Sequence, residues 1–354
     1  MTSLRFPAAV LVFLCHSTVI HVFADQRVND LMSTLTVRSG LSAVEFFFIL
    51  SGFVLAFSHQ PDDTTGAFWL RRAAKIYPNN LVGCALAVLG LVIIGQPVDK
   101  PVLAANALLV HAWWPSVPLL AGVNVPSWSL SAELLFYLAF PALLPLLRRI
   151  PERLLWTAFW VIVAVIFVMP ILADLLPGTP LFAEGTSLPR YWLVYFCPPV
   201  RMLEFVMGIL LARIVQAGRW IRIGQGPALL LVALALVIQT QVSLLYAAVA
   251  VLIVPLALLV GAAASGDVRE TRSPMRTRSA VRLGELAFAV YIVHYQVLIY
   301  GDRLLGGRTW GTAAGFGVLA GMFAVTLALA WPLYRFVERP VVRITAARSP
   351  TLVG

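Results

Sequence analysis

The first long apolar run of the chain carries two residues that can do chemistry, Arg5 and His16, which lie eleven positions apart. At about 100° and 1.5 Å per residue, a helix places both side chains on one face, roughly 16 Å from each other. Such a helix would hold the cation at a membrane surface and the imidazole near the middle of the bilayer. An ionisable side chain at that depth is costly and commonly marks a functional site. We therefore expect His16 to act as a general base, unless it only hydrogen-bonds to a neighbouring helix.

The elements that position these residues are predicted to be membrane-spanning helices. Of the 354 residues, 60% are apolar and 12% are charged, and the mean hydropathy is +0.89. Soluble domains are roughly half apolar and one quarter charged. Ten stretches approach the ~20 apolar residues that one span needs, and the seventh is the shortest. They are centred on 6–23, 41–58, 80–96, 130–147, 154–173, 199–217, 227–241, 245–264, 283–303 and 312–336. The segment 101–120 is interrupted by proline, and we expect it to form a partly embedded loop.

The net charge of +10 is distributed as in a membrane protein rather than as in a nucleic-acid-binding protein. Nineteen of the 26 lysine and arginine residues lie in alternate loops and near the chain ends, and six lie in the intervening loops. This asymmetry follows the positive-inside rule and predicts that both termini are cytoplasmic. The expected fold is an all-α polytopic membrane bundle of about ten transmembrane helices. Residues 1–340 would form the membrane domain and 341–354 a cytoplasmic tail.

Two features of the sequence admit other interpretations. Residues 1–24 resemble a signal peptide, but the apolar run is long and contains His16 and His21, so we expect it to be retained as the first helix. Cys15, Cys84 and Cys197 lie in or beside apolar stretches, with no spacing typical of a disulfide framework or a metal site. No metal is predicted.

Seven motifs follow one another along the chain and together suggest a family. They are Arg5-x10-His16, Glu-Phe-Phe-Phe-Ile-Leu-Ser-Gly-Phe at 45–53, Phe-Trp-Leu-Arg-Arg-Ala-Ala-Lys-Ile-Tyr-Pro at 68–78, Ser-Trp-Ser-Leu-Ser-Ala-Glu at 127–133, Arg-Met-Leu-Glu-Phe at 201–205, Tyr-Ile-Val-His at 291–294 and Val-Glu-Arg-Pro at 337–340. In this order they resemble the membrane-bound acyltransferase-3 family, whose members move acyl groups, usually acetyl, from acyl-CoA onto glycans and other extracytoplasmic acceptors.

One departure is Lys75, where the family has a second arginine after Arg72. Lysine keeps the charge but loses the planar fork that holds phosphate bidentately.

The resemblance implies a donor site at the cytoplasmic mouth of the third span. Arg5, Arg72, Lys75 and Tyr77 are the residues expected to bind coenzyme A, whose 3′-phosphate and pyrophosphate suit a basic cluster. The positive-inside rule alone would also account for these cations, and Arg5 would be an ordinary topology anchor. Proline suits the first turn of a helix, so Tyr77 and Pro78 are expected to begin the span.

The remaining candidates are polar or aromatic residues in or beside spans. Glu133 is expected to orient His16 or to bind acceptor hydroxyls, although a carboxylate in a helix's first turn can also be structural. Glu45, Ser51, Trp128 and His294 are the candidate substrate-binding residues. Trp128 would stack on a sugar or anchor at the interface, and His294 would be a second site histidine or a packing residue. Arg201 and Glu204, three residues apart on one helix, are expected to form a structural ion pair.

The sequence thus favours an O-acyltransferase of the bacterial inner membrane. Acyl-CoA, expected to be acetyl-CoA, would donate its acyl group to a hydroxyl of an extracytoplasmic or lipid-linked sugar or polysaccharide, with His16 as base and no metal cofactor. Direct transfer and a brief acyl-histidine are both compatible with the sequence. The alternative is a secondary transporter that uses buried histidine and glutamate, although we find no internal repeat of the kind that many transporters contain. A relative that binds CoA or glycan without catalysis is a third possibility.

Overall fold

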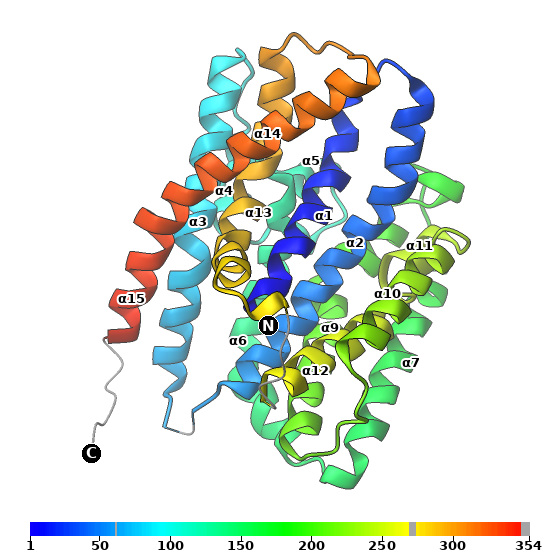
Figure 1. Ribbon diagram of the computed structural model, residues 1–354, viewed down its shortest axis with the longest axis vertical. Coiled ribbons are helices and arrows are strands. Elements are labelled where there is room, and N and C mark those ends of the chain that lie inside the picture. Colours follow the sequence, from blue (N-terminus) through cyan, green and yellow to red (C-terminus); the bar gives the residue numbers. More distant parts are fainter. Residues whose placement is uncertain (61, 269–273, 348–354) are drawn as a thin grey trace.

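The computed structural model describes residues 1–60, 62–268 and 274–347, and within these ranges it is a bundle of helices with no extended strand (Figure 1). The helices are α1 (Arg5–Ser17), α2 (Gln26–Phe57), α3 (Thr65–Ile93), α4 (Lys100–Ala107), α5 (Val117–Ala121), α6 (Trp128–Arg148), α7 (Leu155–Asp174), α8 (Leu188–Tyr191), α9 (Pro198–Gln216), α10 (Gln225–Gln239), α11 (Leu244–Val249), α12 (Ile253–Val268), α13 (Arg278–Leu304), α14 (Thr312–Pro332) and α15 (Arg339–Ala347). π-Helical turns at Trp192–Phe196 and Leu333–Glu338 join α8 to α9 and α14 to α15. The predicted all-α class is confirmed.

Nine helical segments of the described chain are long and apolar enough to cross a membrane, and α10 is a shorter apolar helix. The seventh predicted span corresponds to α10, which at 15 residues is about 22 Å long and falls short of the ~30 Å hydrocarbon core. Large apolar side chains such as Trp160, Leu230 and Trp331 are exposed on the outer faces of α7, α10 and α14. Lipid is the environment that such surfaces fit, and the chain is therefore a multi-pass membrane protein.

Contacts at the two ends of α10 indicate that it nevertheless joins the two faces of the bundle. Just before α10, Arg219 forms an ion pair of 3.6 Å with Glu152, which precedes α7. Just after α10, the chain meets Glu184, which follows α7: a Glu184 carboxylate oxygen accepts a hydrogen bond of 2.9 Å from the Leu244 N–H. Because these contacts lie at opposite ends of α7, the helix α10 covers the same depth of the bundle, where it packs against α12.

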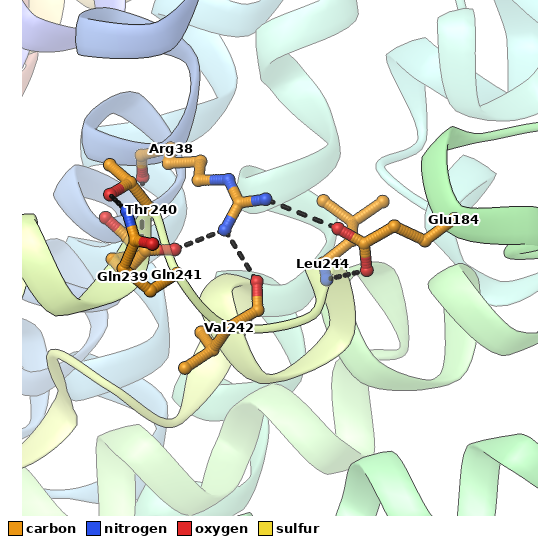
Figure 2. A network of polar contacts seen from close by, with 7 residues as sticks. All are labelled: Arg38, Glu184, Gln239, Thr240, Gln241, Val242 and Leu244. Carbon is orange, nitrogen blue, oxygen red and sulfur yellow. Dashed lines mark hydrogen bonds and ion pairs between the residues drawn. The ribbon is translucent and has the colours of Figure 1, made fainter.

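A polar network built on Arg38 of α2 fixes the far end of α10 (Figure 2). The Arg38 guanidinium donates hydrogen bonds to the carbonyl oxygens of Gln239 and Val242, the latter at 2.8 Å, and lies 3.4 Å from Glu184. In return, the Gln239 side chain donates to the Arg38 carbonyl oxygen at 3.1 Å and to Ser42 at 2.8 Å. One arginine therefore satisfies backbone groups that would otherwise lack partners at the end of a helix.

Helix α2 occupies the centre of the bundle and packs against α1, α9 and α12. Its closest neighbour is α9, where a Cβ on Gly52 would lie 1.9 Å from the Phe205 carbonyl oxygen and a Cβ on Gly208 would lie 2.1 Å from that of Ile49. Only glycine allows backbones to approach this closely, as at other small-residue interfaces in membranes. Gly52 and Gly208 therefore set the short distance between α2 and α9.

The segment 94–124 forms short helices held by buried polar groups rather than a span, in agreement with the prediction for 101–120. The Asn106 amide donates to the Ser127 hydroxyl at 3.1 Å, and that hydroxyl lies 3.3 Å from His111 Nε2. Burial lowers the pKa of His111 to about 4, so the imidazole stays neutral at physiological pH.

One expected boundary, the start of the third span, is wrong. Helix α3 begins at Thr65, where the Thr64 hydroxyl caps it by accepting a hydrogen bond from the Ala67 N–H, and Pro78 lies inside the helix. The capping threonine sets the start, and membrane helices tolerate an internal proline because neighbouring groups compensate for the lost bond. The expected tail is in part helical as well: residues 341–347 belong to α15, whereas 348–354 lie outside the described residues.

We predict that Arg38→Met lowers the thermal stability of the purified protein. The substitution leaves two backbone carbonyls and Glu184 without the guanidinium, and each buried polar group that loses its partner costs about 1–3 kcal/mol. Thermal unfolding in detergent, followed by the exposure of the buried thiols of Cys84 and Cys197, measures the change. Arg27→Ala on the same helix is the control, because Arg27 is exposed. Equal melting temperatures for the two variants would contradict a bracing role for Arg38.

Candidate active site

A cavity of about 460 Å³ lies between α1, α2, α3, α6 and α13, and residues of the segment 334–343 also line it. Figure 1 shows α15 alongside α3, with α13 between α3 and α1. The charged residues that line the cavity are Arg5, Arg72, Lys75, Glu133, Glu285, Glu338, Arg339 and Arg343. The outermost of these, Arg343, is exposed, so the cavity opens at the face of the bundle that carries the basic loops.

The five cations of the cavity differ in whether they already have a partner. Lys75 forms an ion pair with Glu338, whose second oxygen accepts a hydrogen bond of 2.8 Å from Asn79. Arg72 instead lies over the rings of Phe68 and Tyr137, at 5.8 and 5.9 Å from their centroids, and its buried Nε has no hydrogen-bond partner in the described part of the chain.

Arg5, Arg339 and Arg343 likewise form no ion pair or hydrogen bond through their side chains with any residue of 1–60, 62–268 or 274–347. Arg5 is within electrostatic range of Glu133 and Glu338. The cavity therefore offers guanidinium groups that are free to bind an anion, whereas the ammonium of Lys75 is engaged.

Glu133 anchors a cluster of hydroxyl groups inside the cavity. One of its oxygens accepts hydrogen bonds from the Ser51 hydroxyl at 3.1 Å and from the Tyr137 hydroxyl at 2.5 Å. Ser51 thus lines the cavity as expected. Glu133 was expected near His16, at the extracytoplasmic end of its span. Instead it shares a cavity with Arg72, because the cavity reaches deep into the bundle from the basic face.

His16 lies in the last turn of α1 and is hydrogen-bonded to His294 of α13, with 2.9 Å between His16 Nδ1 and His294 Nε2. His16 is partly exposed, whereas His294 is fully buried, and neither lines the cavity. Tyr291 lies between: it lines the cavity, and its ring centroid is 5.8 Å from that of His294. The Tyr291 hydroxyl is fixed by Ser129 and by the Pro126 carbonyl oxygen, both at 2.8 Å. Arg5 and His16 thus share one helix, but only Arg5 lines the cavity.

Three other candidate residues lie outside the cavity lining. Trp128 is buried against Phe48 and Tyr195, and Tyr77 packs against the hydrophobic core. Glu45 is fully buried, and its carboxylate has no hydrogen-bond partner among the residues described. Trp128 and Glu45 are buried in packed helices and leave no surface for a substrate, and the half-buried Tyr77 does not line the cavity, so the geometry does not support direct binding by these residues.

Glu45 instead belongs to a buried charge cluster between α2 and α9. Arg201 and Glu204 form the expected ion pair at 2.8 Å, both almost completely buried, and Glu45 is within electrostatic range of them. The guanidinium also lies over the rings of Phe48 and Tyr195. This cluster is part of the core.

Several lining residues were not among the sequence candidates, namely Tyr137, Glu285, Tyr291, Glu338, Arg339 and Arg343. Tyr291, Glu338 and Arg339 occur in the family motifs, but the sequence alone indicates no role for them. Arg343 follows Arg339 by one helical turn, a spacing that puts both on one face and could have drawn attention to the pair. In the described part of the chain, no group of three or more histidine, cysteine, aspartate or glutamate residues could hold a metal ion.

We predict that Lys75 and Glu338 act as one structural unit. Glu338→Gln should lower the melting temperature, because it leaves a partly buried ammonium without its counter-ion. Adding Lys75→Met removes that uncompensated charge, so the double variant should melt no lower than Glu338→Gln alone. The single variant Lys75→Met completes the comparison. If the double variant loses as much melting temperature as Glu338→Gln and Lys75→Met lose together, the two residues do not interact.

Comparison with known proteins agrees with the geometry. The model of an acyltransferase domain family matches residues 1–335. Acyltransferase MdmB of Streptomyces mycarofaciens is 39% identical over 360 residues, which cover 99% of this chain and 93% of that protein. Nodulation protein 10 of Rhizobium leguminosarum bv. viciae is 27% identical over 129 residues, 30% of this chain and 34% of that protein. No solved structure matches the chain. Neither relative favours a transporter, and the chain belongs to the acyltransferase-3 family of membrane-embedded O-acyltransferases.

Proposed function

We propose that the protein transfers an acyl group, expected to be acetyl, from cytoplasmic acyl-CoA to a hydroxyl of an extracytoplasmic or lipid-linked sugar or polysaccharide. The observation that carries this proposal is the arginine-lined cavity, which is also lined by Tyr291, one helical turn from His294. A bacterial inner membrane would supply acyl-CoA on the basic face and a glycan acceptor on the other.

The unpaired arginines support a phosphorylated donor. Coenzyme A carries a pyrophosphate and a 3′-phosphate, and guanidinium groups bind phosphate bidentately. Arg5 and Arg72 lie deeper in the cavity and suit the pyrophosphate. Arg339 and Arg343, one turn apart at the mouth, suit the 3′-phosphate at the outer end of the donor. Lys75 adds positive charge but is assigned mainly to holding α3 against Glu338.

The hydroxyl cluster suits the arm of the donor that carries the thioester. Because Ser51 and Tyr137 donate their protons to Glu133, their oxygen lone pairs remain free to accept hydrogen bonds from the amide groups of the arm. Glu133 would therefore position the donor rather than tune His16. The thioester would pass beside Tyr291 to reach the histidine pair.

His16 is assigned the proton transfer. It takes the proton of the acceptor hydroxyl as the oxygen attacks the thioester carbonyl carbon, a new C–O bond forms and the C–S bond breaks. The proton then passes from His16 to the CoA thiolate, so the reaction consumes no net proton. In the acyl-histidine variant, His16 takes the acyl group first and passes it to the acceptor.

We predict that His16→Ala abolishes transfer while protein level and topology stay normal. Inverted membrane vesicles from the native host receive radiolabelled acetyl-CoA outside, and label is followed into the glycan fraction. Loss of the base should reduce the rate by about 10²–10⁴-fold. His21→Asn is the control, because His21 is exposed and asparagine tolerates its positive φ of 43°. Undiminished labelling in His16→Ala would remove His16 from the mechanism, and an absence of label with wild-type protein and intact glycan would favour a non-catalytic relative.

The assignment of the outer arginines predicts a donor-specific defect. Arg343→Gln should raise the KM for acetyl-CoA about tenfold, because one charge-assisted bond to phosphate is lost. The KM for acetyl-dephospho-CoA, which lacks the 3′-phosphate, should not change. Arg335→Gln on the preceding turns is the matched control, since Arg335 is exposed and does not line the cavity. An equal rise in KM for both donors would mean that Arg343 does not recognise the 3′-phosphate.

A further inference from the structure

His16 ends a short chain of hydrogen bonds that begins at the backbone of α13. His294 Nδ1 lies 2.8 Å from the Tyr291 carbonyl oxygen and 3.2 Å from that of Val290. Its other ring nitrogen, Nε2, lies 2.9 Å from His16 Nδ1. The two histidines are therefore joined through His16 Nδ1 and His294 Nε2. The other end of this hydrogen-bond series is formed by backbone carbonyl oxygens of α13.

The backbone determines where the protons lie in this chain. A carbonyl oxygen only accepts hydrogen bonds, so His294 Nδ1 must carry a proton and donate it. A neutral imidazole has one N–H, which leaves His294 Nε2 as an acceptor. His16 Nδ1 must then be the donor of the 2.9 Å bond, and the lone pair of neutral His16 is left on Nε2.

The neutral form of His294 is the one that its surroundings allow. The side chain is completely buried, and its ring packs near Phe13 and Tyr291. No carboxylate forms an ion pair with it in the part of the chain that the structure describes. A buried charge without a partner is strongly disfavoured, so His294 does not carry a second proton at rest.

The environment of His16 leaves the other nitrogen available. In residues 1–60, 62–268 and 274–347, the recorded side-chain hydrogen bond of His16 is made by Nδ1, and the side chain is partly exposed. The ring itself is held edge-on to Tyr295, with 5.3 Å between the centroids. The nitrogen that carries the lone pair is thus the accessible one.

We propose that His294 is a positioning residue that keeps His16 in the tautomer protonated on Nδ1, so that Nε2 is presented to the acceptor hydroxyl. The inference rests on the proposed function of His16 as the base. It replaces the expectation that His294 binds substrate, because His294 acts only through His16.

This arrangement does what a carboxylate does in a hydrolase triad, where an aspartate holds the catalytic histidine in the correct tautomer. A neutral imidazole performs this task without placing a carboxylate in the membrane-embedded core. When Nε2 takes the proton of the hydroxyl, the His16 imidazolium still donates its Nδ1 proton to His294. The positive charge is thereby stabilised until the thiolate takes the proton from Nε2.

Two substitutions separate hydrogen bonding from packing. His294→Leu fills the position with an apolar side chain and removes the acceptor nitrogen Nε2. In His294→Gln the amide oxygen can still accept the hydrogen bond from His16 Nδ1. We expect His294→Leu to lower kcat about 100-fold, the loss that a misplaced catalytic group produces, with an unchanged KM for acetyl-CoA. His294→Gln should retain kcat to within about tenfold of wild type. The assay is label transfer from radiolabelled acetyl-CoA in native-host vesicles, with His21→Asn as control.

Nitrogen-15 NMR of histidine-labelled protein reports the tautomer directly. The signals of His16 are identified by their loss in His16→Ala. In wild-type protein they should show a protonated Nδ1 and an unprotonated Nε2, and in His294→Leu a mixture of both tautomers.

The outcomes distinguish this inference from the proposed function. If His16→Ala is inactive while His294→Leu keeps the kcat of wild type, His16 is the base but His294 does not position it. If both His294 variants lose activity equally although they fold, hydrogen-bond acceptance is not the role of His294. If wild-type His16 is protonated on Nε2, the tautomer assignment is wrong. Full activity of His16→Ala would instead refute the proposed function itself.

Discussion

A charged or polar group inside this bundle must find its partner in the protein or in a ligand, because lipid offers none. Most such groups in the described structure are satisfied internally: Arg201 by Glu204, Lys75 by Glu338, and Arg38 by carbonyl oxygens and Glu184. Glu45, buried between α2 and α9, is one exception, and the cavity holds the others, where Arg5, Arg72 and two arginines of α15 have no anionic partner within the described chain. A phosphorylated donor satisfies this imbalance, and acyl-CoA is the donor that the acyltransferase family leads us to propose.

The same constraint explains how the chemistry is divided along α1. The charged cavity reaches Tyr291 but is not lined by the histidine pair, which contains no carboxylate. On the proposed function, the anionic phosphates and the neutral base would occupy separate compartments, and only the thioester end of the donor would have to reach both. Helix α1 contributes Arg5 to one compartment and His16 to the other, and α13 contributes Tyr291 to the first and His294 to the second.

The sequence predicted the helices well because a long run of apolar residues is compatible with few structures other than a membrane span. It predicted the contacts between the helices poorly. The start of α3 was missed because the capping Thr64 precedes an amphipathic stretch rather than an apolar one. The spacing of Arg5 and His16 predicts one helical face, but no local pattern shows that the cavity ends between them. His16 and His294 are 278 residues apart, and Lys75 and Glu338 are 263 apart. Such pairs arise from the packing of α1 on α13 and of α3 on the segment 333–338. The burial of Glu45 and Trp128 depends in the same way on how α2, α6 and α9 meet.

Site-specific thiol labelling tests the central claim of the proposed function. The claim is that the donor enters the bundle from the basic face, whereas His16 is reached from the opposite face. Ser51→Cys and His16→Cys would be made separately in a protein whose Cys15, Cys84 and Cys197 are replaced by alanine, and a membrane-impermeant maleimide added to inverted or right-side-out vesicles. We predict that Ser51→Cys reacts only in inverted vesicles and is protected by acetyl-CoA, whereas His16→Cys reacts only in right-side-out vesicles. Reaction of both variants from one face, or no protection of Ser51→Cys by acetyl-CoA, would contradict the account.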